Sequence, residues 1–313
     1  MKPSQQPVLH CVYSKGFAVC AAAMLAPIAQ AEPLFGPASP VVEWNTFSGE
    51  QLTDISPDGL TAILQSDRAS VRTRIYSSTR PTLSDPWSVP SNADVAATNS
   101  ATNVGHGILS PDGLSLFYQD NPHIKVATRA TPFVPFPAGT LVAELNVGAA
   151  ERPGKMSADG LRMYLEIFDG VDTNLFVSDR PTTSDPWSTP TQGPFAANVN
   201  TGDLEFEPYV TPDELQLYFA STRLGGLGGI DIWWADRASV SVPFSAAVNL
   251  ASVNTVASDR SPELFGDTLF FTSTRIGTSD EFSAVAVPEP GSFALLCGSG
   301  CLWLLRRRRR AGL

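Results

Sequence analysis

The sequence predicts an all-β fold, and three observations carry that prediction. First, Gly and Pro contribute 24 and 26 of the 313 residues, which favours many short elements joined by turns. Second, a phrase resembling "SPDGL" recurs along the chain and is followed by alternating, aromatic-rich stretches typical of strands. Third, the recurrence interval of 47 to 54 residues is the size of a four-stranded blade. The predicted fold is a five-bladed β-propeller.

The repeats align on an aspartate that follows an asparagine by thirteen residues. The aspartates are Asp58, Asp112, Asp159, Asp213 and Asp267, and the asparagines are Asn45, Asn99, Asn146, Asn200 and Asn254. Pro-Asp-Gly suits a tight turn between two strands, because proline presets the turn and glycine tolerates its unusual backbone angles. Two units depart from this order, since Glu214 replaces the glycine and the fifth unit reads "GDTLFFT".

The fifth unit lacks a fourth strand, because "LFFTSTRIGTSDEFSAVAV" runs directly into the C-terminal tail. The stretch "SPVVEWNT" (Ser39–Thr46) precedes the first unit and ends at Asn45 in the register of the other fourth strands. We expect it to complete the fifth blade and close a ring over residues 39–287. Closure would leave no exposed strand edge between the first and last blades.

A second repeated phrase begins at Arg80 ("RPTLSDPWSVP") and again at Arg180 ("RPTTSDPWSTP"). It connects the third and fourth strands of blades one and three. The arginine recurs at Arg129 and Arg237, and the aromatic residues are Trp87, Phe133, Trp187 and Phe244. We expect a structural role, with the aromatic ring between adjacent sheets and the arginine paired with a turn carboxylate.

These units resemble the WD40-like, TolB-type propeller repeat, and the best match is "TPDELQLYFASTRLGGLGGIDIWWADR" (Thr211–Arg237). The resemblance covers roughly residues 40–287. It implies the fold but no activity, since such repeats occur in binding, periplasmic and enzymatic proteins alike.

The N-terminal segment, residues 1–31, has the pattern of a secretory signal peptide. Lys2 and Lys15 precede the apolar run "GFAVCAAAMLAPIA", which leads to Ala29-Gln30-Ala31. We expect cleavage after Ala31 and export across the inner membrane.

The C-terminal segment comprises residues 288–313, and the motif Val287-Pro288-Glu289-Pro290 spans its start. The apolar stretch Phe293–Leu305 is shorter than the roughly 17–25 residues of a spanning helix. An arginine run follows, made of Arg306, Arg307, Arg308, Arg309 and Arg310, and would stay cytoplasmic. Motif, apolar segment and arginines resemble the PEP-CTERM sorting signal. The resemblance implies an exosortase partner in exopolysaccharide-producing Gram-negative bacteria, transient inner-membrane anchoring through a short hydrophobic helix, and a cell-surface or extracellular destination.

Charge and cysteine usage exclude several classes of function. Two of the 21 basic residues lie in the leader and five in the tail, so 14 remain against 30 acids, a net charge near −16. Such a body is not expected to bind nucleic acid or anionic membranes. All cysteines, Cys11, Cys20, Cys297 and Cys301, lie in the two ends. The body therefore has no disulfide, thiolate metal site or cysteine nucleophile.

Candidate ligand-binding residues lie where the fourth strand of one blade leads into the first strand of the next. They are His106, Arg152, Glu205, Glu207, Asp259 and Arg260. Glu205 and Glu207 would share one face of an extended strand and are the candidate carboxylate pair of a hydrolase. A catalytic triad is not expected, because the body's two histidines, His106 and His123, have no G-x-S-x-G partner.

No cofactor is expected, and no metal site is assigned. Calcium is the one cation that acidic loops such as "EIFDGVDTN" could hold, through Glu166, Asp169 and Asp172, although no EF-hand pattern is present. The glycine-rich "RLGGLGGID" joins two strands, so it does not fit a phosphate-binding loop.

The favoured function is a non-catalytic cell-surface or matrix protein that binds a polysaccharide or a protein through loops at the channel mouth. The alternatives are a carbohydrate-active hydrolase and a purely structural matrix component. Carboxylates 5–9 Å apart in a pocket would favour the hydrolase, and an aromatic platform would favour sugar binding.

Overall fold

The computed structural model describes residues 10–14, 17–21, 32–69, 71–100, 102–196 and 198–288. The chain forms two compact units, residues 1–31 and 32–313. In the first, β1 (His10–Ser14) pairs antiparallel with β2 (Phe17–Ala21). The predicted cleavage site at Ala29 and Ala31, and the sorting tail from Glu289 to the end with its arginines, lie outside the described residues. Over the ranges just given, no helix has the length and apolar character needed to cross a bilayer.

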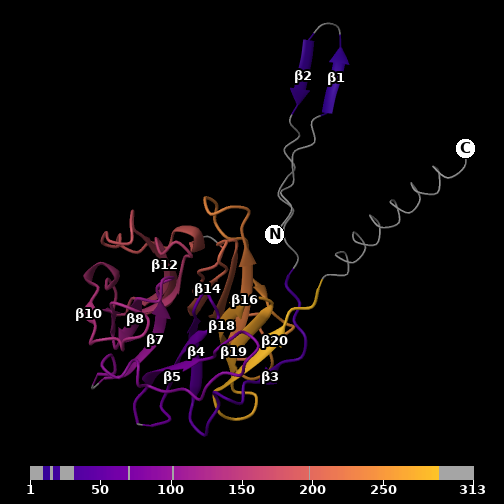
Figure 1. Ribbon diagram of the computed structural model, residues 1–313. Coiled ribbons are helices and arrows are strands. Elements are labelled where there is room, and N and C mark those ends of the chain that lie inside the picture. The colour runs from indigo at the N-terminus through magenta and orange to yellow at the C-terminus, as the bar shows by residue number, and fades with distance from the viewer. Residues whose placement is uncertain are drawn as a thin grey trace, which may run out of the picture. The chain divides into compact units, whose positions relative to one another are not determined.

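Residues 32–288 form five antiparallel sheets, which confirms the predicted five-bladed propeller (Figure 1). The first strands are β4 (Glu50–Ile55), β7 (Val104–Leu109), β11 (Ala150–Met156), β14 (Glu205–Val210) and β18 (Asp259–Phe265). The second strands are β5 (Thr61–Ser66), β8 (Ser115–Asp120), β12 (Arg162–Phe168), β15 (Gln216–Ser221) and β19 (Thr268–Ser273). The third strands are β6 (Arg74–Thr79), β9 (His123–Thr128), β13 (Thr173–Asp179), β16 (Asp231–Asp236) and β20 (Asp280–Val285).

The N-terminus closes the ring, as the sequence predicts. Strand β3 (Ser39–Pro40) pairs with β20, with Ser39 opposite Ser283 and Pro40 opposite Phe282. In Figure 1 the indigo β3 lies against the yellow β20. The expected strand Ser39–Thr46 is too long, because residues 42–44 form a turn.

The other fourth strands are also shorter than predicted. They are β10 (Thr140–Leu141) and β17 (Val248–Asn249), and blades one and three have only a single bridge each. The repeated asparagine explains the difference. Asn200 Oδ1 accepts a hydrogen bond from Leu175 N, and its Nδ2 donates to Leu175 O, both at 3.0 Å. All five asparagines bind the third strand of their blade in this way. The asparagine side chain therefore satisfies the backbone N–H and C=O groups that a longer fourth strand would otherwise pair with.

The repeated aspartate stabilises the turn between the first and second strands. In blade one, Asp58 Oδ1 accepts hydrogen bonds from Ser56 Oγ at 2.6 Å and Leu60 N at 3.0 Å. Gly59 has φ +71°, and a Cβ there would lie 2.1 Å from the Phe265 ring. Blade four makes the same turn with Glu214, at φ +57°.

Glu214 has partners that compensate for its left-handed backbone. Its carboxylate accepts hydrogen bonds from the Tyr164 hydroxyl and from Arg162 NH1, the latter at 3.0 Å. The sequence departure at this position therefore leaves the turn intact.

The repeated arginine stacks on the repeated aromatic ring. Arg180 lies 4.2 Å from the ring centroid of Trp187, and its Nε donates to Gly160 O at 2.9 Å. The predicted carboxylate partner is wrong for this arginine, because the nearest acceptor in the turn is a backbone carbonyl. In blade two, Arg129 stacks on Phe136 at 4.1 Å, whereas the predicted Phe133 is 94% exposed.

The aromatic rings do lie between neighbouring sheets. Trp187 of blade three packs edge-on against Phe117 of blade two, with centroids 6.0 Å apart. Trp87 of blade one packs against Trp44, which is fully buried beside Phe270 of blade five. The second repeated phrase is therefore part of the architecture, and the chemistry must be sought along the channel.

Candidate functional site

The five first strands surround the central channel and run in the same direction. Their starts meet at one end, and their last residues meet at the other end together with the turns into the second strands. The two ends differ in chemistry. We call the group Gln51, His106, Arg152, Glu207 and Arg260 the polar end, and the hollow at the opposite end the cavity.

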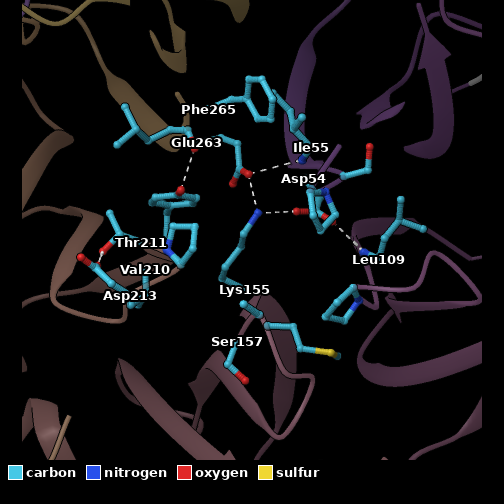
Figure 2. Close-up of a pocket in the computed structure, with 18 of the residues that line it drawn as sticks. Asp54, Ile55, Leu109, Lys155, Ser157, Val210, Thr211, Asp213, Glu263 and Phe265 are labelled. Atoms are coloured by element: carbon cyan, nitrogen blue, oxygen red, sulfur yellow. Dashed lines mark hydrogen bonds and ion pairs between the residues drawn. The ribbon is translucent and has the colours of Figure 1, made fainter. Parts of the chain in front are cut away.

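The cavity has a volume of about 600 Å³ (Figure 2). Equivalent residues near the end of each first strand form an apolar ring, namely Ile55, Leu109, Met156, Val210 and Leu264. Outside the ring, the first turn residues form the mouth, namely Pro57, Pro111, Ala158, Pro212 and Gly266. The repeat thus builds an apolar hollow with approximate five-fold symmetry.

A half-buried lysine occupies the floor of the cavity. Lys155 Nζ donates hydrogen bonds to Asp54 Oδ1 at 2.6 Å and to Glu263 Oε1 at 2.5 Å (Figure 2). The nitrogen also lies 5.1 Å from the centroid of the Tyr209 ring. Blades one, three, four and five therefore each send one side chain to a single point. Glu263 also lines the narrow channel beyond, so this cluster separates the cavity from the polar end.

The two carboxyl groups of the floor are further held by backbone donors. Asp54 Oδ2 accepts from Leu109 N at 2.7 Å, and Glu263 Oε1 accepts from Ile55 N at 3.3 Å. Burial raises the pKa of Glu263 to about 8. Burial opposes the charge of Lys155, but Asp54 and Glu263 outweigh it and raise the lysine's pKa above its ordinary value. The ammonium group of Lys155 is therefore charged at neutral pH, in contact with two buried carboxyl groups.

Glu207 is the centre of the polar end. Its carboxylate accepts hydrogen bonds from Gln51 Nε2 at 2.8 Å and from Ser261 N and Oγ at 2.9 Å. Arg260 NH1 lies 3.9 Å from Glu207 Oε1. Arg152 binds Glu166, and Glu166 Oε2 accepts the backbone N–H of Glu207 at 2.6 Å. Burial raises the pKa of Glu166.

The backbone is strained at this end. His106, Glu207 and Ser261 have φ of +49°, +56° and +54° at equivalent places in β7, β14 and β18, where bulges interrupt the pairing. Non-glycine residues rarely adopt such angles, and bulges commonly redirect side chains. Burial, followed by the charges of Arg152 and Arg260, holds the pKa of His106 well below its ordinary value. The imidazole is therefore neutral at pH 7.

The structure brings His106, Arg152, Glu207 and Arg260 together and separates the other two predicted residues from them. Glu205 accepts from Thr201 N at 3.0 Å and Thr201 Oγ1 at 2.6 Å, and pairs with Arg223 at 3.0 Å. Asp259 makes the same contacts with Thr255 and Arg275. Both are fully buried braces of the loops that enter the first strands.

Glu205 and Glu207 therefore do not form the shared face that strand alternation predicts. The bulge between Phe206 and Tyr209 shifts the register, so Glu205 turns toward Arg223 while Glu207 lines the channel.

The predicted calcium ligands also point to different places. Asp169 Oδ1 accepts from Val171 N at 2.8 Å and Asp172 N at 2.9 Å within a hairpin turn, whereas Glu166 is buried beside Arg152. Within the part of the chain that the structure describes, no three His, Cys, Asp or Glu side chains are placed to hold a metal ion.

Sequence reasoning missed Lys155 and Glu263. Both occupy the same position of the first strand in their blades, a position that is Asp54, Ile108, Lys155, Tyr209 and Glu263 around the ring. Opposite charges at one repeat position of inward-facing strands would have predicted their meeting at the axis.

No family model matches this chain, and no curated protein is similar to it. Solved structures do resemble it. The α-L-arabinofuranosidase PaAbf62A from Podospora anserina, in complex with cellotriose, is 14% identical over 82% of this chain and 95% of its own, with a TM-score of 0.50. A putative TolB from Agrobacterium tumefaciens is 16% identical over 80% and 97%, with a TM-score of 0.46. A thermostable family-43 glycoside hydrolase is 14% identical over 79% and 94%, with a TM-score of 0.47. At 14% identity, the resemblance to PaAbf62A is evidence for the propeller fold alone.

Proposed function

We propose that this chain is an exported, non-catalytic binding protein that accepts an apolar segment of a protein partner in the cavity. The observation that carries the proposal is the cavity's lining. Large, mostly apolar hollows with a few convergent polar groups are the usual form of a binding site. Here a volume of about 600 Å³ has room for several side chains of a partner.

The lining favours a protein segment over a polysaccharide. Five aliphatic or thioether side chains and three prolines face the hollow, and among its described lining residues only Tyr209 and Phe265 are aromatic. Tyr209 is buried, and its hydroxyl donates to Leu264 O at 2.6 Å. Phe265 is half-buried, and its ring packs against Gly59 with the Arg80 guanidinium 5.7 Å from its centroid. Both rings are thus engaged by the protein, and the lining suits branched aliphatic groups better than a sugar.

The floor favours binding over hydrolysis. Asp54 and Glu263 both hold Lys155 Nζ, so the lysine lies between the two carboxyl groups that would have to act on a glycosidic bond. A glycosidase instead needs its acid and its nucleophile or base free on either side of the bond.

A carbohydrate-active hydrolase is the second candidate, and the polar end is the observation that favours it. There Glu207 lies beside His106, Arg152 and Arg260, with strained backbone at two of these positions. Its weakness is that Glu207 is already held by Gln51 and Ser261.

Export and sorting belong to the same proposal. The leader at residues 1–31 and the Val287-Pro288-Glu289-Pro290 tail support delivery across the inner membrane and processing by an exosortase. The mature body would then act at the cell surface or in the extracellular matrix.

The test uses residues 32–288, which contain the five sheets of the propeller. Thermal unfolding is measured with a peptide rich in leucine and arginine, one rich in leucine and glutamate, and a set of arabino-, galacto- and cello-oligosaccharides. Ala158→Arg blocks the cavity mouth, where Ala158 is exposed. Gly202→Arg is the matched control at the opposite end, because a Cβ at Gly202 meets nothing within 4 Å.

We expect a peptide at a hundred times its Kd to raise the midpoint by about 5–10 °C. Ala158→Arg should abolish the shift, and Gly202→Arg should retain it. Oligosaccharide binding that survives Ala158→Arg, or oligosaccharide cleavage, would overturn the proposal in favour of the polar end.

A further inference from the structure

The described chain ends on the face of the propeller that carries the cavity mouth. After β20, Ala286 N donates to Asp267 O at 2.7 Å, and Val287 N donates to Leu34 O at 2.7 Å. Gly266, the residue before Asp267, lines the cavity. The polypeptide that follows Pro288 therefore starts beside the hollow, at the end of the propeller opposite the polar end.

The sequence that follows has the length to reach the hollow. Residues 289–292 separate Pro288 from the apolar stretch Phe293–Leu305. Four extended residues span about 13 Å, and every later residue adds about 3.3 Å. The apolar stretch can thus enter the mouth from its own point of attachment.

The chemistry of the tail complements that of the cavity in two ways. Its apolar stretch is complementary to the ring of apolar side chains that lines the cavity. Its arginines are opposite in charge to five exposed aspartates, each of which directly follows a mouth residue. These aspartates are Asp58, Asp112, Asp159, Asp213 and Asp267. Hydrogen bonds from Ser110 and Ser157 lower the pKa of Asp112 and Asp159, so these two are ionised at neutral pH.

We infer that, in the full chain, the C-terminal tail folds back onto the cavity, with several apolar side chains of Phe293–Leu305 in the hollow and Arg306–Arg310 against the aspartates of the mouth. This docked state is an alternative to the membrane-anchored state that the sequence predicts. The inference rests on the proposed function, because the tail would occupy the same site as the external partner. Removal of the tail by the sorting enzyme would then open the cavity, so binding would be confined to the processed protein.

The chain's own cysteines provide the test. The body has none, whereas Cys301 lies within the apolar stretch of the tail. In the full chain, Cys11, Cys20 and Cys297 are replaced by serine, which leaves Cys301 as the single thiol. A second thiol is then introduced at the mouth by Ala158→Cys, or at the opposite end by Gly202→Cys as the matched control. Both chains are oxidised with diamide at low protein concentration, and disulfides are mapped by mass spectrometry.

We expect the Ala158→Cys chain to form an intramolecular disulfide with Cys301 at least about tenfold faster than the Gly202→Cys chain, because docking raises the local concentration of the tail thiol. Replacing Arg306–Arg310 by glutamine, or raising the salt concentration, should slow the reaction at Ala158→Cys only. Equal rates for the two chains, or disulfides only between chains, would overturn the inference.

The same experiment separates this inference from the proposed function. If crosslinking fails but residues 32–288 bind the leucine–arginine peptide, only the tail inference is wrong. If crosslinking succeeds but no external peptide binds, the cavity serves the tail, and the proposed function is wrong.

Discussion

The two ends of the channel come from the same repeat and yet have opposite chemistry. At the polar end, bulged first strands bring Glu207, Arg152 and Arg260 together, and each carboxylate already has several donors. At the cavity end, the same strands present aliphatic side chains around about 600 Å³ of open volume. The comparison teaches that dense charge marks the end where the carboxylates are already hydrogen-bonded, whereas open volume marks the end where we propose that a ligand binds.

The boundary between the ends is the Lys155 cluster, and removing its cation should have the largest effect. Lys155→Met leaves Asp54 buried without its counter-ion, which should lower the free energy of unfolding by about 3–5 kcal/mol. Denaturant unfolding at pH 7 measures it. Lys155→Met combined with Asp54→Asn should recover most of the loss. A loss below about 1 kcal/mol for the single variant would mean that the cluster does not hold the two ends apart.

Like Glu263 of the cavity floor, Glu281 of β20 should contribute to the pH dependence of stability. Burial raises its pKa to about 8, and Oε2 has no hydrogen-bond partner in the described part of the chain. A folded pKa above the unfolded value of 4.5 gives stability that is complete below pH 4.5 and is lost as pH rises through 8.

Glu281→Gln removes this loss, so between pH 6 and 9 the variant should gain about 2–3 kcal/mol relative to the wild type, from 1.36 kcal/mol per pKa unit. Chemical denaturation at both pH values provides the comparison. Parallel pH profiles for the two proteins would show that Glu281 is ionised when folded.

Each end also has a repeated stabilising contact, namely the asparagine hydrogen bonds at the polar end and the arginine stacking at the cavity end. The asparagine hydrogen bonds should contribute more to stability. Asn200→Ala leaves the N–H and C=O of Leu175 without partners, which should cost about 2 kcal/mol. Asn103→Ala, at an exposed asparagine on the same end, is the control. Equal midpoints in urea for the two variants would show that the asparagine clamp contributes nothing.

The arginine stacking at the cavity end should contribute less to the free energy of unfolding. Arg180→Lys loses the planar stacking on Trp187 and the directed bond to Gly160 O, at a cost of about 1 kcal/mol. Urea unfolding measured beside Asn200→Ala ranks the two. A larger loss for Arg180→Lys would show that the arginine stacking at the cavity end stabilises the fold more than the asparagine hydrogen bonds do.

The sequence predicts the blades because turn chemistry and repeat spacing are local. Asp58 and Gly59 determine the geometry of their turn through local contacts alone. Asn45 has the same register as the other repeated asparagines, and it therefore predicts that the N-terminal segment closes the ring. The fourth strands were overestimated for a physical reason. A side chain such as Asn200 can replace ladder hydrogen bonds, and strand patterns do not reveal that substitution.

The site was harder to predict because it depends on register across the channel. Strand alternation places Glu205 and Glu207 on one face, but a single bulge separates them. Conversely, Lys155 and Glu263 are distant in sequence and meet only because their strands are equivalent members of a closed ring. Lys155 and Glu263 become predictable when equivalent positions of the five first strands are compared around the channel axis.

The most direct test of the cavity as the binding site is hydrogen exchange of residues 32–288 with and without the leucine–arginine peptide. We expect slower exchange in the turns that form the mouth, residues 56–59, 110–113, 157–160, 211–214 and 265–268. Protection confined to the loops that lead into the first strands, near Arg152 and Arg260, would contradict it and place the functional site at the polar end.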